Sequence, residues 1–196
     1  MLGAWVTLAE EFVILVDEGD RPVGVAEKLA AHRQGLLHRA FSIFVCNSQG
    51  QLMVQRRSPS KYHCGGLWTN TCCSHPRPQE STLESARRRL FEEMGFRCPL
   101  VELFSFTYCV DLDHQLTEYE YDHVLYGIYD GEPSVNPDEA DAWRWVEPTQ
   151  LSCELTAHPE QFTPWLRICW ARVQHYLGQD LGQDSKVIPE NMPIAL

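Results

Sequence analysis

Three histidines and a pair of glutamates stand out as residues that could bind a metal ion. His32 and His38 lie six positions apart ahead of an apolar segment, and His75 follows a pair of cysteines. Glu118 and Glu120 are two positions apart, so on a strand both side chains would point to one face. Imidazoles and carboxylates on a rigid sheet suit Mn²⁺, Zn²⁺ or Fe²⁺. Spacing alone does not bring the five together, and a solitary histidine is more often a surface residue or a hydrogen-bonded core residue.

Basic residues are concentrated in the first half of an otherwise acidic chain. Arg57 is expected at the end of a strand, and Lys61 follows four positions later. These two side chains could hold a phosphate group, because arginine offers a planar fork of donors and lysine a compact charge. The alternative is solvated surface, which is what we expect for Arg87 and Arg88.

The segment from Ser74 to Gly95 carries a spaced pattern of acids and arginines. It reads S-x5-E-x7-R-R-x-x-E-E-x-G, and its fixed positions include Glu80, Arg88, Arg89, Glu92, Glu93 and Gly95. This pattern resembles the Nudix box, a loop–helix–loop whose glutamates hold Mg²⁺ against a diphosphate. Ser74 stands at the usual first glycine, and Arg89 replaces a glutamate that hydrolytic members need. The resemblance therefore implies diphosphate binding without diphosphate hydrolysis.

Further short motifs follow one another along the chain in a single order. They are Glu27-Lys28, Ala31-His32, His38-Arg39-Ala40-Phe41-Ser42, Arg56-Arg57, Lys61, Trp68-Thr69-Asn70, Cys73-Ser74-His75-Pro76 and Glu118-Tyr119-Glu120-Tyr121-Asp122. Together they resemble the type I isopentenyl-diphosphate isomerases across roughly residues 10–177. The resemblance implies an α/β (α+β) fold, a Nudix-type mixed-sheet sandwich with flanking helices and an added N-terminal strand region. It also implies interconversion of isopentenyl and dimethylallyl diphosphate.

The same resemblance assigns roles to single residues. The metal ligands would be His32, His38, His75, Glu118 and Glu120. The Cys73 thiol and the Glu120 carboxylate would act on opposite faces of the substrate, with Tyr108 hydrogen-bonded to that glutamate. The diphosphate would contact Lys28, Arg57, Lys61 and Arg89, and Glu93 would bind a Mg²⁺ that bridges to it. Trp165 would line the hydrocarbon pocket.

The expected cofactors are two divalent ions. Mn²⁺ or Zn²⁺, with Mg²⁺ as a further candidate, would occupy the His/Glu site, and a separate Mg²⁺ would accompany the diphosphate substrate. Two other functions stay open at this point. A Nudix pyrophosphohydrolase would release phosphate, and a non-catalytic metal-dependent binding module would hold metal without turnover. Arg89 in place of an acid counts against the hydrolase.

Strands and helices must position these groups. Apolar patterns and turn residues predict strands at Phe12–Val16, Ala40–Cys46, Gln51–Arg56, Val101–Val110, Tyr121–Tyr129 and Ala142–Val146. Ser81–Met94 is predicted to be a helix, because Ser81 and Glu84 form a capping-box pattern and Gly95 suits its C-cap. A second helix is predicted from Thr163-Pro164 to about Leu177.

The resemblance, together with these elements, implies three parts of the 196-residue chain. Residues 1–35 would form an extension that packs on the core and supplies Lys28 and His32, residues 36–177 a Nudix-type catalytic domain, and residues 178–196 a flexible tail.

Composition narrows the function classes further. Sixteen Lys and Arg against twenty-seven Asp and Glu give a formal net charge of −11, which disfavours nucleic-acid binding. Apolar runs of about five residues are too short to span a membrane, and no signal peptide is visible. Eight cysteines without a C-x-x-C pair are expected to be mostly reduced core thiols. We expect a monomeric, cytoplasmic protein whose partner is a small diphosphate substrate.

Overall fold

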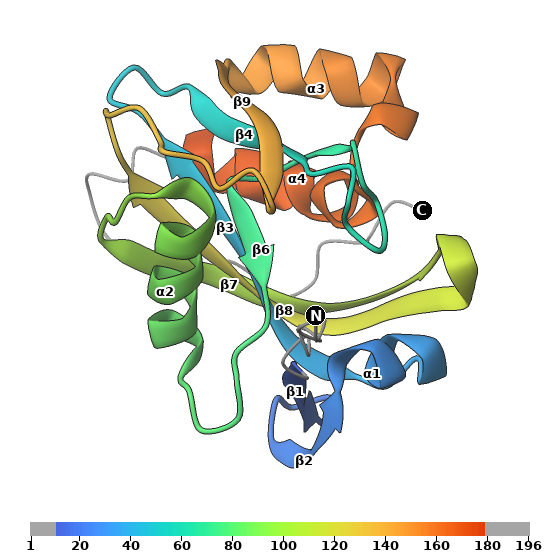
Figure 1. Ribbon diagram of the computed structural model, residues 1–196. Coiled ribbons are helices and arrows are strands. Elements are labelled where there is room, and N and C mark those ends of the chain that lie inside the picture. The colour runs from blue at the N-terminus through green and yellow to red at the C-terminus, as the bar shows by residue number, and fades with distance from the viewer. Residues whose placement is uncertain (1–10, 179–196) are drawn as a thin grey trace, which may run out of the picture.

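Nine strands and four α-helices make up residues 11–178, the part of the chain that the computed structural model describes (Figure 1). Their bounds are β1 Phe12–Val16, β2 Pro22–Glu27, α1 Lys28–Gln34, β3 His38–Cys46, β4 Leu52–Arg57, β5 Trp68–Thr69, β6 Cys72–Ser74, α2 Thr82–Met94, β7 Leu100–Leu112, β8 Leu116–Ile128, β9 Ala140–Val146, α3 Pro148–Ala157 and α4 Pro164–Gly178. Two 3-10 turns, Asp113–Gln115 and Pro159–Gln161, complete the set.

Strand β3 is the centre of the sheet and pairs with β1, β4, β6 and β8. It runs parallel to β8, with His38 opposite Glu120. It runs antiparallel to β6, with Ser42 opposite Cys73. β8 continues into a long antiparallel pairing with β7, and β4 pairs with β9 and β5. The topology therefore brings the short strand β6 and the start of β8 to the two sides of β3.

Helices cover both faces of this sheet because β3 is apolar on both sides. Phe41 and Ile43 pack with Leu90 of α2 in one cluster. Phe44 packs with Leu166 of α4 in the other. All five side chains are fully buried, as expected for a central strand whose two faces are both covered. This layered arrangement confirms the predicted α/β class.

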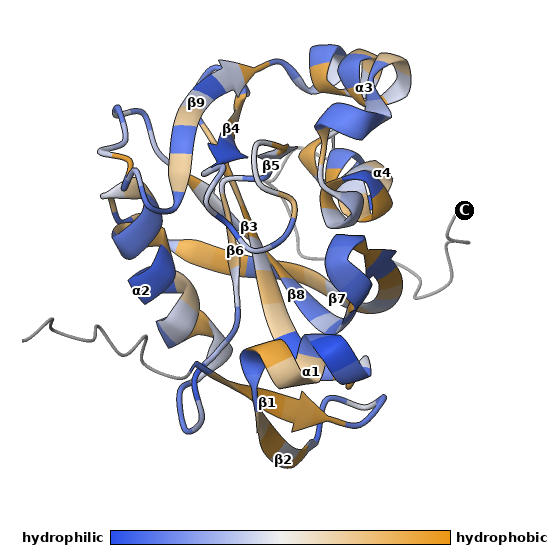
Figure 2. Ribbon diagram, turned by 45° about the vertical axis from the view of Figure 1, so that its right-hand side comes forward, coloured by the Kyte–Doolittle hydropathy of each residue, from blue (hydrophilic) through white to orange (hydrophobic). Residues whose placement is uncertain are grey.

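The N-terminal elements lie at the bottom of Figure 1, where the hairpin β1–β2 extends the sheet from β3 and leads into α1. Figure 2 colours β1 and β2 mainly as hydrophobic. The Glu27 side chain caps α1 by accepting hydrogen bonds from the backbone N–H groups of Leu29 and Ala30. Gly35 ends this helix with a φ of 59°. The short helix places Lys28 at its first position and His32 one turn later, beside the start of β3.

Helix α2 forms as predicted. Ser81 and Glu84 make the reciprocal capping box, and Gly95 closes the helix in the left-handed conformation with a φ of 75°. The expectation that Arg88 is solvated surface is wrong, because its guanidinium is held between Glu80 and Glu92. The arginine therefore ties the loop before the helix to its third turn.

Each predicted element is present, but several boundaries differ. The strand predicted to begin at Tyr121 begins at Leu116, and its partner extends from Leu100 to Leu112, so the two make one long hairpin. The sequence did not predict β2, α1, β5, β6 or α3. The tail predicted for 178–196 lies outside the described residues, apart from Gly178 at the end of α4. Between residues 11 and 178, no helix is long and apolar enough to cross a membrane.

Candidate active site

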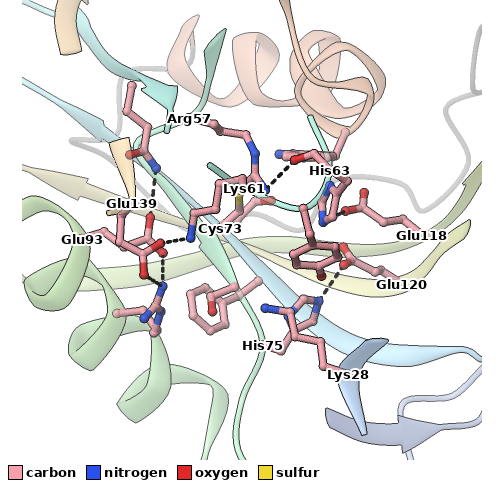
Figure 3. Close-up of a pocket in the computed structure, with 17 residues that line it drawn as sticks. Lys28, Arg57, Lys61, His63, Cys73, His75, Glu93, Glu118, Glu120 and Glu139 are labelled. Atoms are coloured by element: carbon pink, nitrogen blue, oxygen red, sulfur yellow. Dashed lines mark hydrogen bonds and ion pairs between the residues drawn. The ribbon is translucent and has the colours of Figure 1, made fainter. Parts of the chain in front are cut away.

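One pocket collects most of the site residues predicted from the sequence (Figure 3). Ten of them line it: Lys28, Arg57, Lys61, Cys73, His75, Arg89, Glu93, Glu118, Glu120 and Trp165. The other three predicted residues, His32, His38 and Tyr108, are buried beside it and contact its lining. The pocket thus combines side chains from both halves of the sequence, which spacing alone could not establish.

The two buried histidines at its inner end are fixed in one ring orientation. His32 Nδ1 lies 2.7 Å from the Lys28 carbonyl oxygen, and His38 Nδ1 lies 2.7 Å from the Leu36 carbonyl oxygen. Because a carbonyl only accepts, each Nδ1 must donate, which leaves Nε2 with its lone pair. Both Nε2 atoms are buried and lack a hydrogen-bond partner. A free lone pair on an oriented imidazole is what a metal ion needs from a histidine ligand.

The two glutamates come from alternate positions of β8 and share its inner face, as predicted. Glu118 and Glu120 are both buried. Glu120 Oε1 lies 2.8 Å from His75 Nε2 and 3.6 Å from His38 Nε2. Tyr108, opposite Glu120 on β7, donates its hydroxyl to Glu120 Oε2 at 2.6 Å, with Glu118 Oε2 at 3.1 Å. The contact predicted between Tyr108 and Glu120 is therefore present.

These groups fall into two adjoining sets of potential metal ligands. His32, His38, His75 and Glu120 each offer one ligand atom, and these four atoms lie within 4.8 Å of one another. Glu118, predicted as a fifth ligand, forms a second set with His32 and a histidine that was not predicted, His63. Three imidazoles and a carboxylate fit a divalent transition ion. The unpartnered Nε2 atoms of His32 and His38 support that fit.

Burial keeps the His32 and His75 imidazoles neutral, and the two glutamates differ in pKa. Burial lowers the pKa of His32, and it lowers the pKa of His75 to about 3. Burial also raises the pKa of Glu118 well above its ordinary value, and the charge of Glu120 adds to this rise. For Glu120, burial acts in the same sense, but the neighbouring imidazoles of His38 and His75 outweigh it and hold its pKa well below the ordinary value. Glu120 is therefore the carboxylate that carries charge.

The two neighbouring cysteines have different surroundings because they lie on a strand. Cys72 and Cys73 are consecutive in β6, so their side chains point to opposite faces. Cys72 is fully buried in the core under α2, whereas Cys73 lines the pocket. Burial raises the pKa of the Cys73 thiol to about 12, although the Arg57 guanidinium 4.0 Å away opposes this rise. Cys73 is therefore a neutral thiol that can donate a proton.

Basic groups and acids alternate at the other end of the pocket, on the left of Figure 3. Arg89 donates to Glu93 Oε1 at 2.7 Å and to Glu139 Oε1 at 2.9 Å. Glu139 also pairs with Lys61, and Gln55 donates to Glu93 Oε2 at 3.0 Å. Arg89 and Glu93 are thus not an exposed helix-surface pair. Both side chains belong to the pocket, which is where the box resemblance predicted them.

Trp165 closes the pocket from α4. Its ring is buried, and its indole N–H donates to Thr69 Oγ1 at 2.9 Å. The guanidinium carbon of Arg57 lies 5.2 Å from the ring centroid. A buried aromatic ring beside Cys73 gives this wall an apolar surface, and the electrons of its face favour a positive charge.

Among the pocket residues that sequence reasoning missed, three carry a charged, titratable or amide group close to the predicted ones: Gln55, His63 and Glu139. His63 had a usable signal, since it is a fourth histidine two positions after the predicted phosphate-binding Lys61. Gln55 and Glu139 had none, because a glutamine in a strand and an acid in a turn are common surface residues.

Comparisons with known proteins agree with this architecture. The NUDIX domain family matches residues 36–166. A protein of Aromatoleum aromaticum named isopentenyl-diphosphate Delta-isomerase 2 is 55% identical over 164 residues, which span 84% of this chain and 87% of that protein. A Pectobacterium atrosepticum protein named isopentenyl-diphosphate Delta-isomerase is 48% identical over 174 residues, spanning 89% and 97% of the two chains.

Solved structures show the same fold. A protein from Deinococcus radiodurans superimposes with a TM-score of 0.71 at 28% identity, covering 83% of this chain and 98% of its own. A MutT protein from Methanosarcina mazei gives a TM-score of 0.57 at 18% identity, covering 71% and 94%. The region matched by the family, residues 36–166, contains strands β3 to β9 and helix α2.

Proposed function

The chain belongs to the isopentenyl-diphosphate Delta-isomerases of the NUDIX domain family, and we propose how its own pocket interconverts isopentenyl and dimethylallyl diphosphate. The observation that carries the proposal is the pairing of Cys73 and Glu120 in one pocket. One is a neutral thiol, and the other is a charged carboxylate. A proton donor and a proton acceptor thus face the same space.

The reaction moves a carbon–carbon double bond by one position, so one carbon gains a proton and another loses one. Cys73 donates a proton to the alkene, which leaves a tertiary carbocation, and Glu120 removes a proton from the neighbouring carbon. No electron enters or leaves, so these two acid/base groups balance the reaction. The hydroxyl of Tyr108 donates to Glu120 and biases that carboxyl toward its charged form.

Binding of the diphosphate is proposed for the basic end of the pocket. Arg57, Lys61 and Arg89 line it, and Lys28 also lines the pocket, with its ammonium group over the Tyr62 ring. Arginine forks match phosphoryl oxygens. Glu93 is the proposed ligand of a Mg²⁺ that accompanies the diphosphate. The salt bridges of Lys61 and Arg89 to Glu139 would have to open or widen when the diphosphate arrives.

The Trp165 ring is proposed to line the hydrocarbon part of the pocket. Its π-face stabilises a nearby cation by about 0.5–2 kcal/mol when water is absent. Water must be kept out, because it would trap the carbocation as an alcohol.

A metal ion is proposed at His32, His38, His75 and Glu120, with Glu118 at its side. When bound, such an ion supplies positive charge that fixes the orientation of Glu120 and favours its deprotonated form. Whether Mn²⁺, Zn²⁺ or Mg²⁺ occupies the site stays a prediction, as do a monomeric state and a cytoplasmic location.

The domain division is also part of the proposal. Residues 1–35 would serve as an extension that supplies Lys28 and His32 from α1, and residues 36–177 would form the catalytic domain. The position of both residues on α1 and the match of the family from residue 36 support this division.

The decisive experiment separates isomerisation from hydrolysis. Purified protein, incubated in D₂O with isopentenyl diphosphate, Mg²⁺ and a defined transition ion, should form the dimethylallyl isomer, which NMR detects together with solvent deuterium in its methyl groups. Phosphate and pyrophosphate release should be negligible, because Arg89 stands where the box of hydrolytic members has an acid. Release at a rate comparable to isomer formation would sink the proposal and favour the pyrophosphohydrolase.

A further inference from the structure

His63 is a buried histidine that none of the roles above uses. It lies in the loop between β4 and β5 and is only 6% exposed. Its ring stacks on that of His32 with centroids 5.8 Å apart, and it meets the edge of Trp165 at 6.0 Å. Figure 3 shows it on the same side of the pocket as Glu118 and Glu120. The ring therefore adjoins the proposed metal centre.

The loop holds this imidazole in place through its backbone. Arg57 Nη2 donates to the His63 carbonyl oxygen at 3.3 Å. The backbone N–H groups of Arg57 and Gly66 bond across the loop to the carbonyls of Leu67 and Arg57. At Gly65 a Cβ atom would lie 2.9 Å from the Pro59 carbonyl oxygen, so the two sides of the loop are in close contact. His63 is thus directed inward by a closed loop.

The polar atoms of His63 have no adequate partner within the described chain. Nδ1 is buried and makes no hydrogen bond. Nε2 lies 3.6 Å from Glu118 Oε1, beyond the usual range of about 2.7–3.2 Å for an N–H···O bond. A buried polar atom without a partner costs about 1–3 kcal/mol. The burial of a histidine in this position therefore indicates that its ring nitrogen binds something other than a protein group.

The ligand atoms of His32, His63 and Glu118 lie within 4.8 Å of one another, and His32 also belongs to the set with His38, His75 and Glu120. Because His32 Nδ1 donates to the Lys28 carbonyl, only Nε2 is available to a metal. One lone pair serves one ion, so His32 cannot hold two ions at the same time. The two sets therefore do not bind separate ions together, and an ion held by His32 adjoins the ligand atoms of both.

We propose that His63 is a fourth imidazole of this metal centre and strengthens its binding of nitrogen-preferring ions such as Co²⁺ and Zn²⁺. The inference rests on the proposed centre at His32, His38, His75 and Glu120. Imidazole favours the later ions of the divalent series over Mn²⁺ and Mg²⁺, for which carboxylates are the better ligands. His63 thus influences which metal ion the centre binds, and this role does not require it to transfer a proton.

Metal binding tests this inference without any measurement of turnover. Metal-free wild type, His63→Gln and the control His158→Gln, which changes an exposed histidine, are titrated with Co²⁺ by visible absorption and with Mn²⁺ by EPR. His63→Gln should bind Co²⁺ at least about 10–100-fold more weakly, because removing even a hydrogen-bond partner of a metal ligand weakens binding by that factor. Its Mn²⁺ affinity should change less, and its Co²⁺ spectrum should differ from the other two.

Equal Co²⁺ affinity and identical spectra in all three proteins would overturn the role of His63. If His63→Gln does not fold, proton NMR of the wild-type Co²⁺ protein replaces it, because each bound imidazole contributes one strongly shifted, exchangeable N–H signal. Four such signals support the inference, and three refute it. If four imidazoles bind Co²⁺ but the protein does not isomerise isopentenyl diphosphate, the role of His63 is supported and only the proposed function is rejected.

Discussion

Cys72 and Cys73 have the same chemistry and opposite surroundings. Replacing Cys73, which lines the pocket, by alanine should lower kcat by at least about 10²–10⁴-fold, because one of the two proton-transfer groups is lost. The melting temperature should change little, since the side chain is only partly buried. Isomer formation followed by NMR, beside a thermal melt, measures both effects.

Cys72→Ala is the matched control. This side chain is fully buried among Phe41, Leu90 and Met94, so its removal should cost about 1 kcal/mol of stability and leave kcat within a few-fold of wild type. Equal loss of rate in both variants would show that the pair acts through the structure of β6 and would remove Cys73 from the chemistry.

Single residues were predicted unevenly from the sequence. The Glu118–Glu120 spacing identified a shared strand face, and this held because alternation is a local property of β8. Convergence of His32, His38 and His75 is not local, and only the ordered motifs of a known family indicated it. His63 lies outside those motifs, so neither argument reached it. Its burial becomes visible only when the loop closes against α4.

At the scale of elements, Gly95 decides how α2 ends. It closes the helix with a φ of 75°, and a Cβ atom there would lie 2.5 Å from the Ser134 carbonyl oxygen. Gly95→Ala should therefore destabilise the protein by about 2–4 kcal/mol, combining the left-handed backbone penalty with a backbone clash. Urea unfolding followed by circular dichroism measures this change.

Gly50→Ala separates the two contributions. Gly50 has a similar φ of 82°, but nothing lies within 4 Å of a Cβ built there. The substitution should cost only about 1–2 kcal/mol. An equal loss of stability at both positions would mean that the segment between α2 and β9 moves aside at little cost. That result would contradict the expectation that α2 holds Arg89 and Glu93 in fixed positions.

Elements with strong local signals were predicted, and the others were not. Helix α2 has a Ser81 cap, thirteen residues and a C-terminal glycine. Helix α1 has seven residues and is capped by Glu27, which is not a common N-cap residue. Its position depends on packing against β8 and the hairpin β1–β2 rather than on propensity. Strands β5 and β6, with two and three residues, are likewise too short for a periodic pattern.

For the molecule as a whole, neutral histidines in the metal centre make the metal-free fold sensitive to acid. Burial lowers the pKa of His75 to about 3, whereas an unfolded histidine has a pKa of about 6.5. The folded chain therefore binds fewer protons than the unfolded chain between these values. The stabilising effect is complete above about pH 6.5 and is lost progressively as the pH falls toward about 3.

Urea unfolding of chelator-treated protein at pH 6.5 and pH 5 should show this loss. His75 should account for about 2 kcal/mol of it, since each bound proton contributes about 1.4 kcal/mol per pH unit. When the pH falls from 6.5 to 5, the free energy of unfolding of His75→Gln should therefore decrease by about 2 kcal/mol less than that of wild type. This comparison does not depend on how stable the variant is at either pH. The exposed residue His158 supplies the control, because His158→Gln should follow the wild-type curve. If His75→Gln also follows that curve, the imidazole is protonated in the folded state, and the centre would have to release a proton before any ion could bind there.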